Sequence, residues 1–330
     1  MTRPMTRWLA AALLPALCCG QKWVPQKSGV TASLRGVHAV NEKVVWASGP
    51  QGTWLRTVDG GAHWASGKVT GGEALDFRAI QAFSASEAVV MSSGDGPLSK
   101  IFATRDGGAT WKLLFENPDP KGFFDGLAFS DRLRGALLGD PVDGRFTVFV
   151  TSDGGRKWTR RQGPVANAGE ASFAASNSTL RVRGREIWIA SGGTGGARVF
   201  HSADDGLSWR ASQTSVRHDV QTAGIFGFTW RNRREGIAVG GDYKQDMDGA
   251  GNIAVTHDGG VTWSGSSGPA GFRSAVEYMP DWKAWVATGT SGSDISADGQ
   301  NWRRFDDAAY NAMSSKWAVG PKGAIATLSR

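Results

Sequence analysis

The chain has 330 residues, a formal net charge of +7 and two cysteines, and its length allows either one large domain or two smaller ones. Both cysteines, Cys18 and Cys19, lie in the first twenty residues, so the remainder has neither a disulfide nor thiol chemistry. The positive charge is mild and no Lys/Arg run or known nucleic-acid module accompanies it, so we expect no nucleic-acid partner.

The first twenty residues, Met1 to Gly20, predict a secretory signal peptide. Arg3 and Arg7 precede a short apolar run that ends at Leu17, and this run is too short to span a membrane comfortably. We therefore expect export to the periplasm or the extracellular space, cleavage after Gly20 and no transmembrane segment. A lipoprotein anchor is disfavoured, because Leu17 or Cys18 before the candidate cysteine fits a lipobox poorly.

One short phrase recurs through the rest of the chain: a hydroxyl residue, any residue, Asp, Gly, Gly, two more residues and Trp. The first copy runs from Thr57 to Trp64, and others end at Trp111, Trp158, Trp209 and Trp263. A shortened sixth copy ends at Trp302, and the tryptophans are 47, 47, 51, 54 and 39 residues apart. One turn motif per period of this size indicates a β-propeller.

The chemistry of the phrase suits a tight β-turn. Its Asp carboxylate accepts backbone N–H bonds within the turn, its glycines supply positive φ, and its Trp covers the hairpin. The motif resembles the Asp-box, also called the bacterial neuraminidase repeat. We therefore interpret the following residues as structural rather than catalytic: Asp59, Trp64, Asp106, Trp111, Asp153, Trp158, Asp204, Trp209, Asp258, Trp263, Asp298 and Trp302.

Between the boxes a second signal gives a different count. Segments of the type Trp46-Ala47-Ser48-Gly49 end near Gly49, Gly94, Gly139, Gly192, Gly240, Gly289 and Gly320, one more than the number of boxes. The chain stops at Arg330, where the box of the last blade would follow. The segment 21–29 looks like a fourth strand without a box, so we expect it to pair with the last blade and close the ring. The sequence thus predicts an all-β fold, with residues 21–330 forming a single seven-bladed propeller.

The topology of a propeller restricts where a ligand site can lie. The boxes share one face with the first-to-second turns, and the opposite face surrounds the channel mouth, where ligand sites gather. Candidate binding residues there are Arg35, Arg78, Arg198, Arg273 and Glu277, and candidate catalytic residues are Asp125, Asp140, Asp242 and Tyr243. Arginines suit a carboxylate or a sugar acid. Paired carboxylates suit acid–base work on a glycosidic bond. Alternatively, these charges satisfy one another and the loop backbones.

The sequence predicts neither a metal site nor a cofactor. The histidines do not cluster with acids at metal-ligand spacing. The loop 246–252 lacks the ligand spacing and terminal Glu of a calcium loop. The glycines are turn residues and form no phosphate-binding loop of the strand–helix type.

Over nearly the whole mature chain, the boxes and the segments Trp46-Ala47-Ser48-Gly49 and Ala238-Val239-Gly240-Gly241 resemble the photosystem II stability/assembly factor family. The resemblance implies a chaperone-like binding platform with an arginine-rich patch that contacts a protein client. Arg35, Arg78 and Arg273 are candidates for an analogous patch. Bacterial relatives are often labelled putative oxidoreductases or glycosyl hydrolases, but no redox residue or cofactor cradle supports the first label here.

Sialidases share the box but usually have six blades and an Arg-Ile-Pro segment. Here Arg35 is followed by Gly36-Val37. Glu277 and Tyr278 are neighbours on a strand and point to opposite faces, so they cannot act as the sialidase Tyr/Glu pair. We therefore hypothesise an exported, monomeric, non-enzymatic propeller that binds a protein client or an anionic or glycan ligand. The alternatives are a glycan-active hydrolase or lyase and a carbohydrate-binding module.

Overall fold

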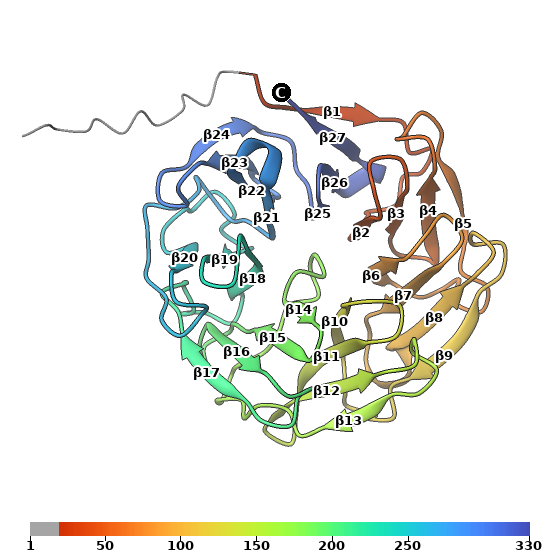
Figure 1. Ribbon diagram of the computed structural model, residues 1–330, viewed down its shortest axis with the longest axis horizontal. Helices are drawn as coiled ribbons and strands as arrows, with labels where there is room; N and C mark the ends of the chain where they lie inside the picture. The colour runs from red at the N-terminus through yellow and green to blue at the C-terminus, as the bar shows by residue number, and fades with distance from the viewer. Residues whose placement is uncertain (1–19) are drawn as a thin grey trace, which may run out of the picture.

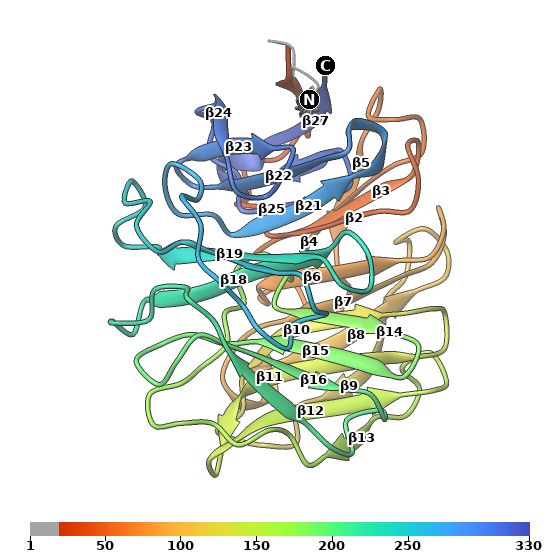
Figure 2. The same ribbon diagram turned by 60° about the vertical axis from the view of Figure 1, so that its left-hand side comes forward.

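A computed structural model describes residues 20–330; residues 1–19, which hold both cysteines and all of the predicted leader except Gly20, lie outside the described residues. Twenty-seven strands form seven antiparallel sheets, and Figure 1 shows these sheets arranged as blades around a central axis. The all-β, seven-bladed prediction is therefore confirmed. A view turned by 60° shows neighbouring blades packed as successive layers (Figure 2).

The first four blades follow the chain in order, and each contains four strands. Blade one contains β2 (Gly36–Ala39), β3 (Val45–Ser48), β4 (Thr53–Thr57) and β5 (Ala65–Lys68). Blade two contains β6 (Phe77–Ala82), β7 (Ala88–Ser92), β8 (Lys100–Thr104) and β9 (Lys112–Glu116), with the 3₁₀ turn η1 (Gly96–Leu98) between β7 and β8. Blade three contains β10 (Phe124–Phe129), β11 (Gly135–Val142), β12 (Arg145–Thr151) and β13 (Thr159–Arg161). Blade four contains β14 (Leu180–Arg183), β15 (Glu186–Ala190), β16 (Arg198–Ser202) and β17 (Arg210–Gln213).

The fifth and sixth blades continue the same order, but blade five has only three strands. Blade five contains β18 (Ala223–Trp230), β19 (Gly236–Asp242) and β20 (Ile253–Thr256). Blade six contains β21 (Ala275–Met279), β22 (Ala284–Gly289), β23 (Gly292–Ser296) and β24 (Arg303–Asp306), with η2 (Pro280–Trp282) after β21. The fourth strand of blade five shrinks to one bridge, Val255 to Ser264, because the following Gly- and Ser-rich residues disfavour strand structure.

Blade seven joins the two ends of the described chain, as the sequence predicts. It contains β25 (Ala312–Ser314), β26 (Trp317–Val319), β27 (Ile325–Ser329) and β1 (Lys22–Gln26), with η3 (Pro321–Gly323) before β27. Strand β1 pairs antiparallel with β27, from Lys22 opposite Ser329 to Gln26 opposite Ile325, and the two lie side by side in Figure 1. This pairing covers the edge that β27 would otherwise expose.

Each box turn is held by hydrogen bonds between its own residues. In the first box, Thr57 Oγ1 donates to Asp59 Oδ1 at 2.8 Å and accepts from the Gly61 N–H at 2.9 Å. The paired glycines Gly60 and Gly61 have φ of 74° and 89°, which a residue with a Cβ rarely adopts. In the fourth box Asp205 takes this left-handed conformation with φ of 60°.

The core lies in the seams between neighbouring blades. Trp46, Trp54 and Trp111 form one cluster, with ring centroids 5.7 to 6.3 Å apart, where blade two packs on blade one. Trp64 packs edge-on against Trp317 of blade seven at 5.6 Å. The box tryptophans Trp111 and Trp64 therefore each anchor their own blade to the preceding one. Within residues 20–330, no helical segment is both long and apolar enough to cross a bilayer.

Candidate functional site

Three inner strands carry a β-bulge where they start at the channel mouth. The pairing register shifts between Phe77 and Ala79 in β6, between Phe124 and Gly126 in β10, and between Ile225 and Gly227 in β18. The residues at these shifts are Arg78, Asp125 and Phe226. A bulge turns one side chain out of the regular alternation of a strand. The same kind of bulge therefore sets the direction of Arg78, Asp125 and Phe226 in blades two, three and five.

A hollow of about 360 Å³ lies at the channel mouth, on the face opposite the boxes. It falls in the size range of ligand pockets. Two arginines, four aromatic rings and a few small polar residues surround it. Its lining residues are Arg35, Arg78, Phe173, Ala174, Ala175, Phe226, Tyr243, Phe272, Ser274, Thr290 and Asn311. We call this hollow the mouth pocket.

The floor of the mouth pocket is a segment that interrupts the propeller repeat. Residues 162–179 connect β13 to β14, and Figure 1 shows a loop beside β14 reaching into the ring. Ser176 Oγ donates to the Ser274 carbonyl of blade six at 2.6 Å. The Asn177 side chain exchanges two hydrogen bonds with the Leu127 backbone of blade three, at 2.8 and 2.9 Å. Residues 162–179, which we call the channel plug, therefore tie blade three to blade six across the ring, and three of them line the pocket.

Aromatic stacking fixes one wall of the pocket. The Phe173 ring of the channel plug stacks on Phe226 with centroids 3.9 Å apart and an interplanar angle of 10°. Phe272 and Tyr243 meet Phe226 edge-on, at 4.7 and 6.0 Å. A Cβ on Gly192 would lie 2.7 Å from the Gly224 Cα, so a glycine is required where blades four and five approach beneath this stack.

The opposite wall carries two arginines with different surroundings. Arg78 Nε donates to Asp76 Oδ2 at 2.7 Å, so its charge is balanced. Arg35 is half-buried, and its guanidinium has no hydrogen-bond or ion-pair partner among residues 20–330. Burial, followed by the neighbouring charge of Arg78, lowers the pKa of Arg35, while the charge of Asp76 acts in the opposite direction. An arginine nevertheless stays protonated in proteins. The Arg35 guanidinium therefore faces the pocket as a positive charge whose hydrogen-bonding groups are unpaired within residues 20–330, and the acid that acts on it, Asp76, is the one that accepts from Arg78.

Two other predicted binding arginines are committed to internal ion pairs. Arg273 is fully buried and donates through Nε to Asp294 Oδ2 at 2.7 Å and through Nη1 to Ser291 at 2.7 Å. Arg198 pairs with the buried Glu170 and donates to the Val165 carbonyl at 3.0 Å. Neither arginine lines the mouth pocket. Both arginines hold segments behind the pocket. Their ion pairs agree with the alternative interpretation from the sequence, in which these charges satisfy one another.

Glu277 lies farther along the channel than the pocket. It accepts from Arg181 of blade four at 3.4 Å. Burial raises the pKa of Glu277, while the charge of Arg181 lowers it. The same Arg181, together with burial as the larger cause, lowers the pKa of His38 to about 4. The inner channel therefore carries its own charge network, apart from the residues that line the mouth pocket.

The candidate carboxylates lie behind the pocket wall, and none of them lines the hollow. Asp125 is 2% exposed and its Oδ2 has no hydrogen-bond partner among residues 20–330. Burial and the nearby Asp140 raise the pKa of Asp125 well above its usual value. Burial also raises the pKa of Asp140, which accepts from the Ser172 N–H at 3.0 Å.

The blade-five pair separates into one structural and one accessible residue. Asp242 is buried and accepts from Thr222 Oγ1 at 2.7 Å and from the Lys244 N–H at 2.9 Å, so it holds its loop. Tyr243 is 47% exposed and lines the mouth pocket. Among the described residues, no group of three or more His, Cys, Asp or Glu side chains is arranged to hold a metal.

Sequence reasoning missed the aromatic half of the pocket. Phe226 occupies the place in blade five that Arg78 and Asp125 occupy in blades two and three, each at the bulge of its inner strand. Aligning the starts of the inner strands would have found it. Phe173 belongs to the channel plug, which has no counterpart in the other blades and therefore no signal in the repeat.

No protein-family model and no curated protein matches the chain. Solved structures do. A structure described as YCF48 bound to D1 peptide aligns with a TM-score of 0.66 at 15% identity, covering 96% of this chain and 99% of that one. YCF48 from Cyanidioschyzon merolae aligns with 0.65 at 16% identity, over 92% and 98% of the two chains. The WD40 propeller domain of Doa1 aligns with 0.62 at 12% identity, over 94% and 97%. These likenesses establish the propeller fold, and two of them match the assembly-factor resemblance found in the sequence.

Proposed function

We propose that this chain is a non-enzymatic binding platform that takes an acidic, aromatic-containing segment of a protein partner into the mouth pocket. The observation that carries the proposal is Arg35: a half-buried guanidinium without a partner among residues 20–330, in a hollow of about 360 Å³. A buried charge costs free energy unless it is paired. A carboxylate that enters the pocket supplies the missing partner, and guanidinium and carboxylate have matching bidentate geometry.

The aromatic wall specifies the rest of the ligand. Phe173 and Tyr243 expose apolar surface across the pocket from Arg35 and Arg78, and Phe226 supports them from behind. An aromatic or aliphatic side chain beside the acidic residue would gain contact area there. A peptide bound by YCF48 in one of the structures of similar fold supports a protein ligand. Export is part of the same proposal and is checked by fractionating cells that express the full chain.

The test measures binding of acidic peptides that contain Phe or Tyr, with Gln-substituted neutral peptides as the paired probes. We expect Arg35→Ala to raise the dissociation constant of the acidic peptide by about ten- to a hundredfold, as for the loss of a hydrogen bond to a charged group. Arg35→Lys should recover only part of the loss, because an ammonium cannot bind a carboxylate bidentately. Arg105 lies on the face of the propeller that carries the boxes, which we call the box face. Arg105→Ala also removes one positive charge and should bind the peptide as the wild type does.

Equal binding of acidic and neutral peptides, or equal binding by Arg35→Ala and the wild type, would overturn the proposal. A second candidate, glycan hydrolysis, rests on Asp125, whose buried carboxyl has one unpartnered oxygen. It predicts turnover on a polysaccharide panel that falls at least about a hundredfold in Asp125→Asn. Glycan binding without turnover, retained in Asp125→Asn, would identify a carbohydrate-binding module instead.

A further inference from the structure

The box face carries its arginines unevenly around the ring. The first-to-second turns of three consecutive blades hold exposed arginines: Arg132 and Arg134 in blade three, Arg183 and Arg185 in blade four, and Arg231, Arg233 and Arg234 in blade five. The corresponding turns of the other blades, 40–44, 83–87, 280–283 and 315–316, hold none. We call this set the arginine arc. Figure 1 shows blades three to five next to one another in the ring.

The same three blades expose aliphatic side chains on the same face. Leu133, Leu207 and Val261 are 55%, 61% and 49% exposed. Leu133 stands between two arginines of the arc, and the other two lie at box tips. Hydrogen bonds tie each box to the arginine turn of its blade: the Asp205 N–H donates to the Arg185 carbonyl and the Gly259 N–H to the Arg234 carbonyl, both at 2.9 Å.

Most of the arc is available to a new anion. Arg134 and Arg233 form no side-chain hydrogen bond or ion pair with any residue in 20–330. Arg183 and Arg185 pair with Glu186 and Asp205, and Arg132 and Arg231 pair with Glu87 and Glu235, all at the surface. Exposed pairs of this kind contribute little, so their guanidinia can exchange a carboxylate for a phosphate.

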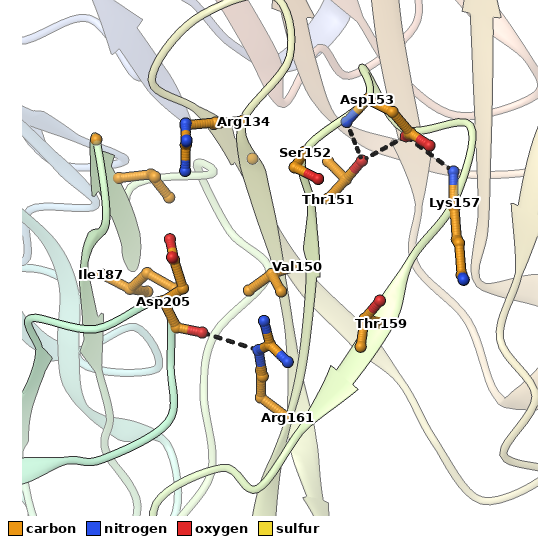
Figure 3. A pocket seen from close by; sticks show the side chains of 13 residues that line it. Arg134, Val150, Thr151, Ser152, Asp153, Lys157, Thr159, Arg161, Ile187 and Asp205 are labelled. Atoms are coloured by element: carbon orange, nitrogen blue, oxygen red, sulfur yellow. Dashed lines mark hydrogen bonds between the residues drawn. The ribbon is translucent and has the colours of Figure 1, made fainter.

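A hollow of about 340 Å³ opens at the seam of blades three and four, within the arc. Arg134, Lys157 and Arg161 line it, and Figure 3 shows them around the cavity. Asp153 and Asp205 line it as well. Asp153 is engaged by Thr151 and the Lys157 N–H, and Asp205 by Arg185. Arg161 donates through Nε to the Asp205 carbonyl at 3.0 Å. The hollow is therefore a recess lined by three cationic and two acidic side chains, with Arg134 free of any side-chain partner within residues 20–330.

We propose that the box face of blades three to five docks onto the surface of an anionic phospholipid bilayer. The arginine arc contacts lipid phosphates, one phosphate enters the seam hollow, and Leu133, Leu207 and Val261 reach the boundary between head groups and acyl chains. Basic residues combined with exposed aliphatic ones are the signature of interfacial binding. A dissolved polyanion would use the arginines but would gain nothing from the aliphatic tips.

The test is co-sedimentation of residues 21–330 with vesicles, because every strand of the closed ring lies between Lys22 and Ser329. We expect binding to phosphatidylcholine vesicles that contain phosphatidylglycerol, weakened by salt, and little binding to phosphatidylcholine alone. Arg134→Ala with Arg233→Ala should reduce partitioning by about fivefold for each arginine. Leu133→Ser with Leu207→Ser should reduce it by about tenfold or more.

Two matched variants keep the test specific. Val58→Ser removes an aliphatic tip that is 50% exposed on the box of blade one, outside the arc, and should leave partitioning unchanged. Arg35→Ala with Arg78→Ala removes two charges from the opposite face and should change it far less than the arc variant does. Binding to dextran sulfate that survives the loss of both leucines, without binding to anionic vesicles, would overturn the bilayer in favour of a soluble polyanion. Equal partitioning of all variants would overturn the arc itself.

Discussion

The carboxylates on the two faces of the propeller titrate in opposite directions. On the box face, hydrogen bonds from the side chain and N–H of Thr110 lower the pKa of Asp106 to about 2. At the channel mouth, burial raises the pKa of Asp125 and of Asp140. The box face thus stabilises charge at its turns, whereas the mouth buries charge that its own residues leave incompletely satisfied.

The arginines show the same contrast. On the box face they project into solvent from turn tips, where a guanidinium costs little to leave unpaired. At the mouth, Arg273 is fully buried against Asp294, and Arg35 is half-buried with no partner among residues 20–330. The same residue type thus occupies three settings: an internal ion pair, a half-buried position in a pocket, and exposed positions on the box face.

The largest expected effect separates the arginine of the internal ion pair from the other arginines. Arg273→Met leaves the buried Asp294 without its counterion, and we expect the free energy of unfolding to fall by about 3 to 5 kcal/mol. Denaturant-induced unfolding measures this. Arg134→Met on the box face should change it by less than about 0.5 kcal/mol. Equal losses of unfolding free energy in Arg273→Met and Arg134→Met would contradict the distinction between the buried ion pair and the exposed arginines. Recovery in Arg273→Met with Asp294→Leu would show that the unpaired charge causes the loss.

The second effect concerns the buried carboxyl at the mouth. The folded-state pKa of Asp125 is raised, so its stabilising contribution is present below its unfolded pKa and is lost as pH rises through the folded value. Asp125→Asn mimics the protonated form. We expect it to increase the free energy of unfolding at neutral pH by at least about 1 kcal/mol, with little effect near pH 4. Unfolding at both pH values measures the difference.

Asp106→Asn is the counterpart on the box face and should show the opposite sign. Its folded-state pKa is depressed to about 2, so its contribution is present above the unfolded pKa and is lost as pH falls through about 4 toward 2. The variant should destabilise the protein at neutral pH and should cease to do so in acid. Two variants with the same sign of effect at neutral pH would contradict the comparison of the two faces.

A smaller effect tests the box turn. Thr104 is buried, and its Oγ1 donates to Asp106 and accepts from the Gly108 N–H at 2.9 Å. Thr104→Val keeps the shape but leaves that N–H without its partner, so we expect a loss of about 1 to 2 kcal/mol in thermal or denaturant unfolding. Thr110→Val removes a hydroxyl from an exposed position of the same turn, where water can take its place. This variant should therefore lose less free energy of unfolding than Thr104→Val. The reverse order would contradict the hydrogen-bond account of the box.

The sequence predicted the ring better than the pocket because the ring repeats. Box spacing gave six blades, and the orphan segment that contains Trp23 gave the closure of the seventh; both depend on local patterns that recur. Of the predicted site residues, Arg35, Arg78 and Tyr243 line the mouth pocket, because the topology places their segments at the mouth. The channel plug was missed because its sequence occurs once. Arg273 does not line the pocket, because it is buried against Asp294, a contact that leaves no local signal in the sequence.

The most direct test of the central claim observes the arginine side chains themselves during ligand binding. Titration of the labelled protein with an acidic, Phe-containing peptide, followed by NMR at the arginine Nε–H groups, reports which guanidinia meet a carboxylate. The account predicts that Arg35 shifts first and Arg78 with it, while Arg134 and Arg233 on the box face stay unchanged. Shifts confined to Arg134 and Arg233, with Arg35 unaffected, would contradict it.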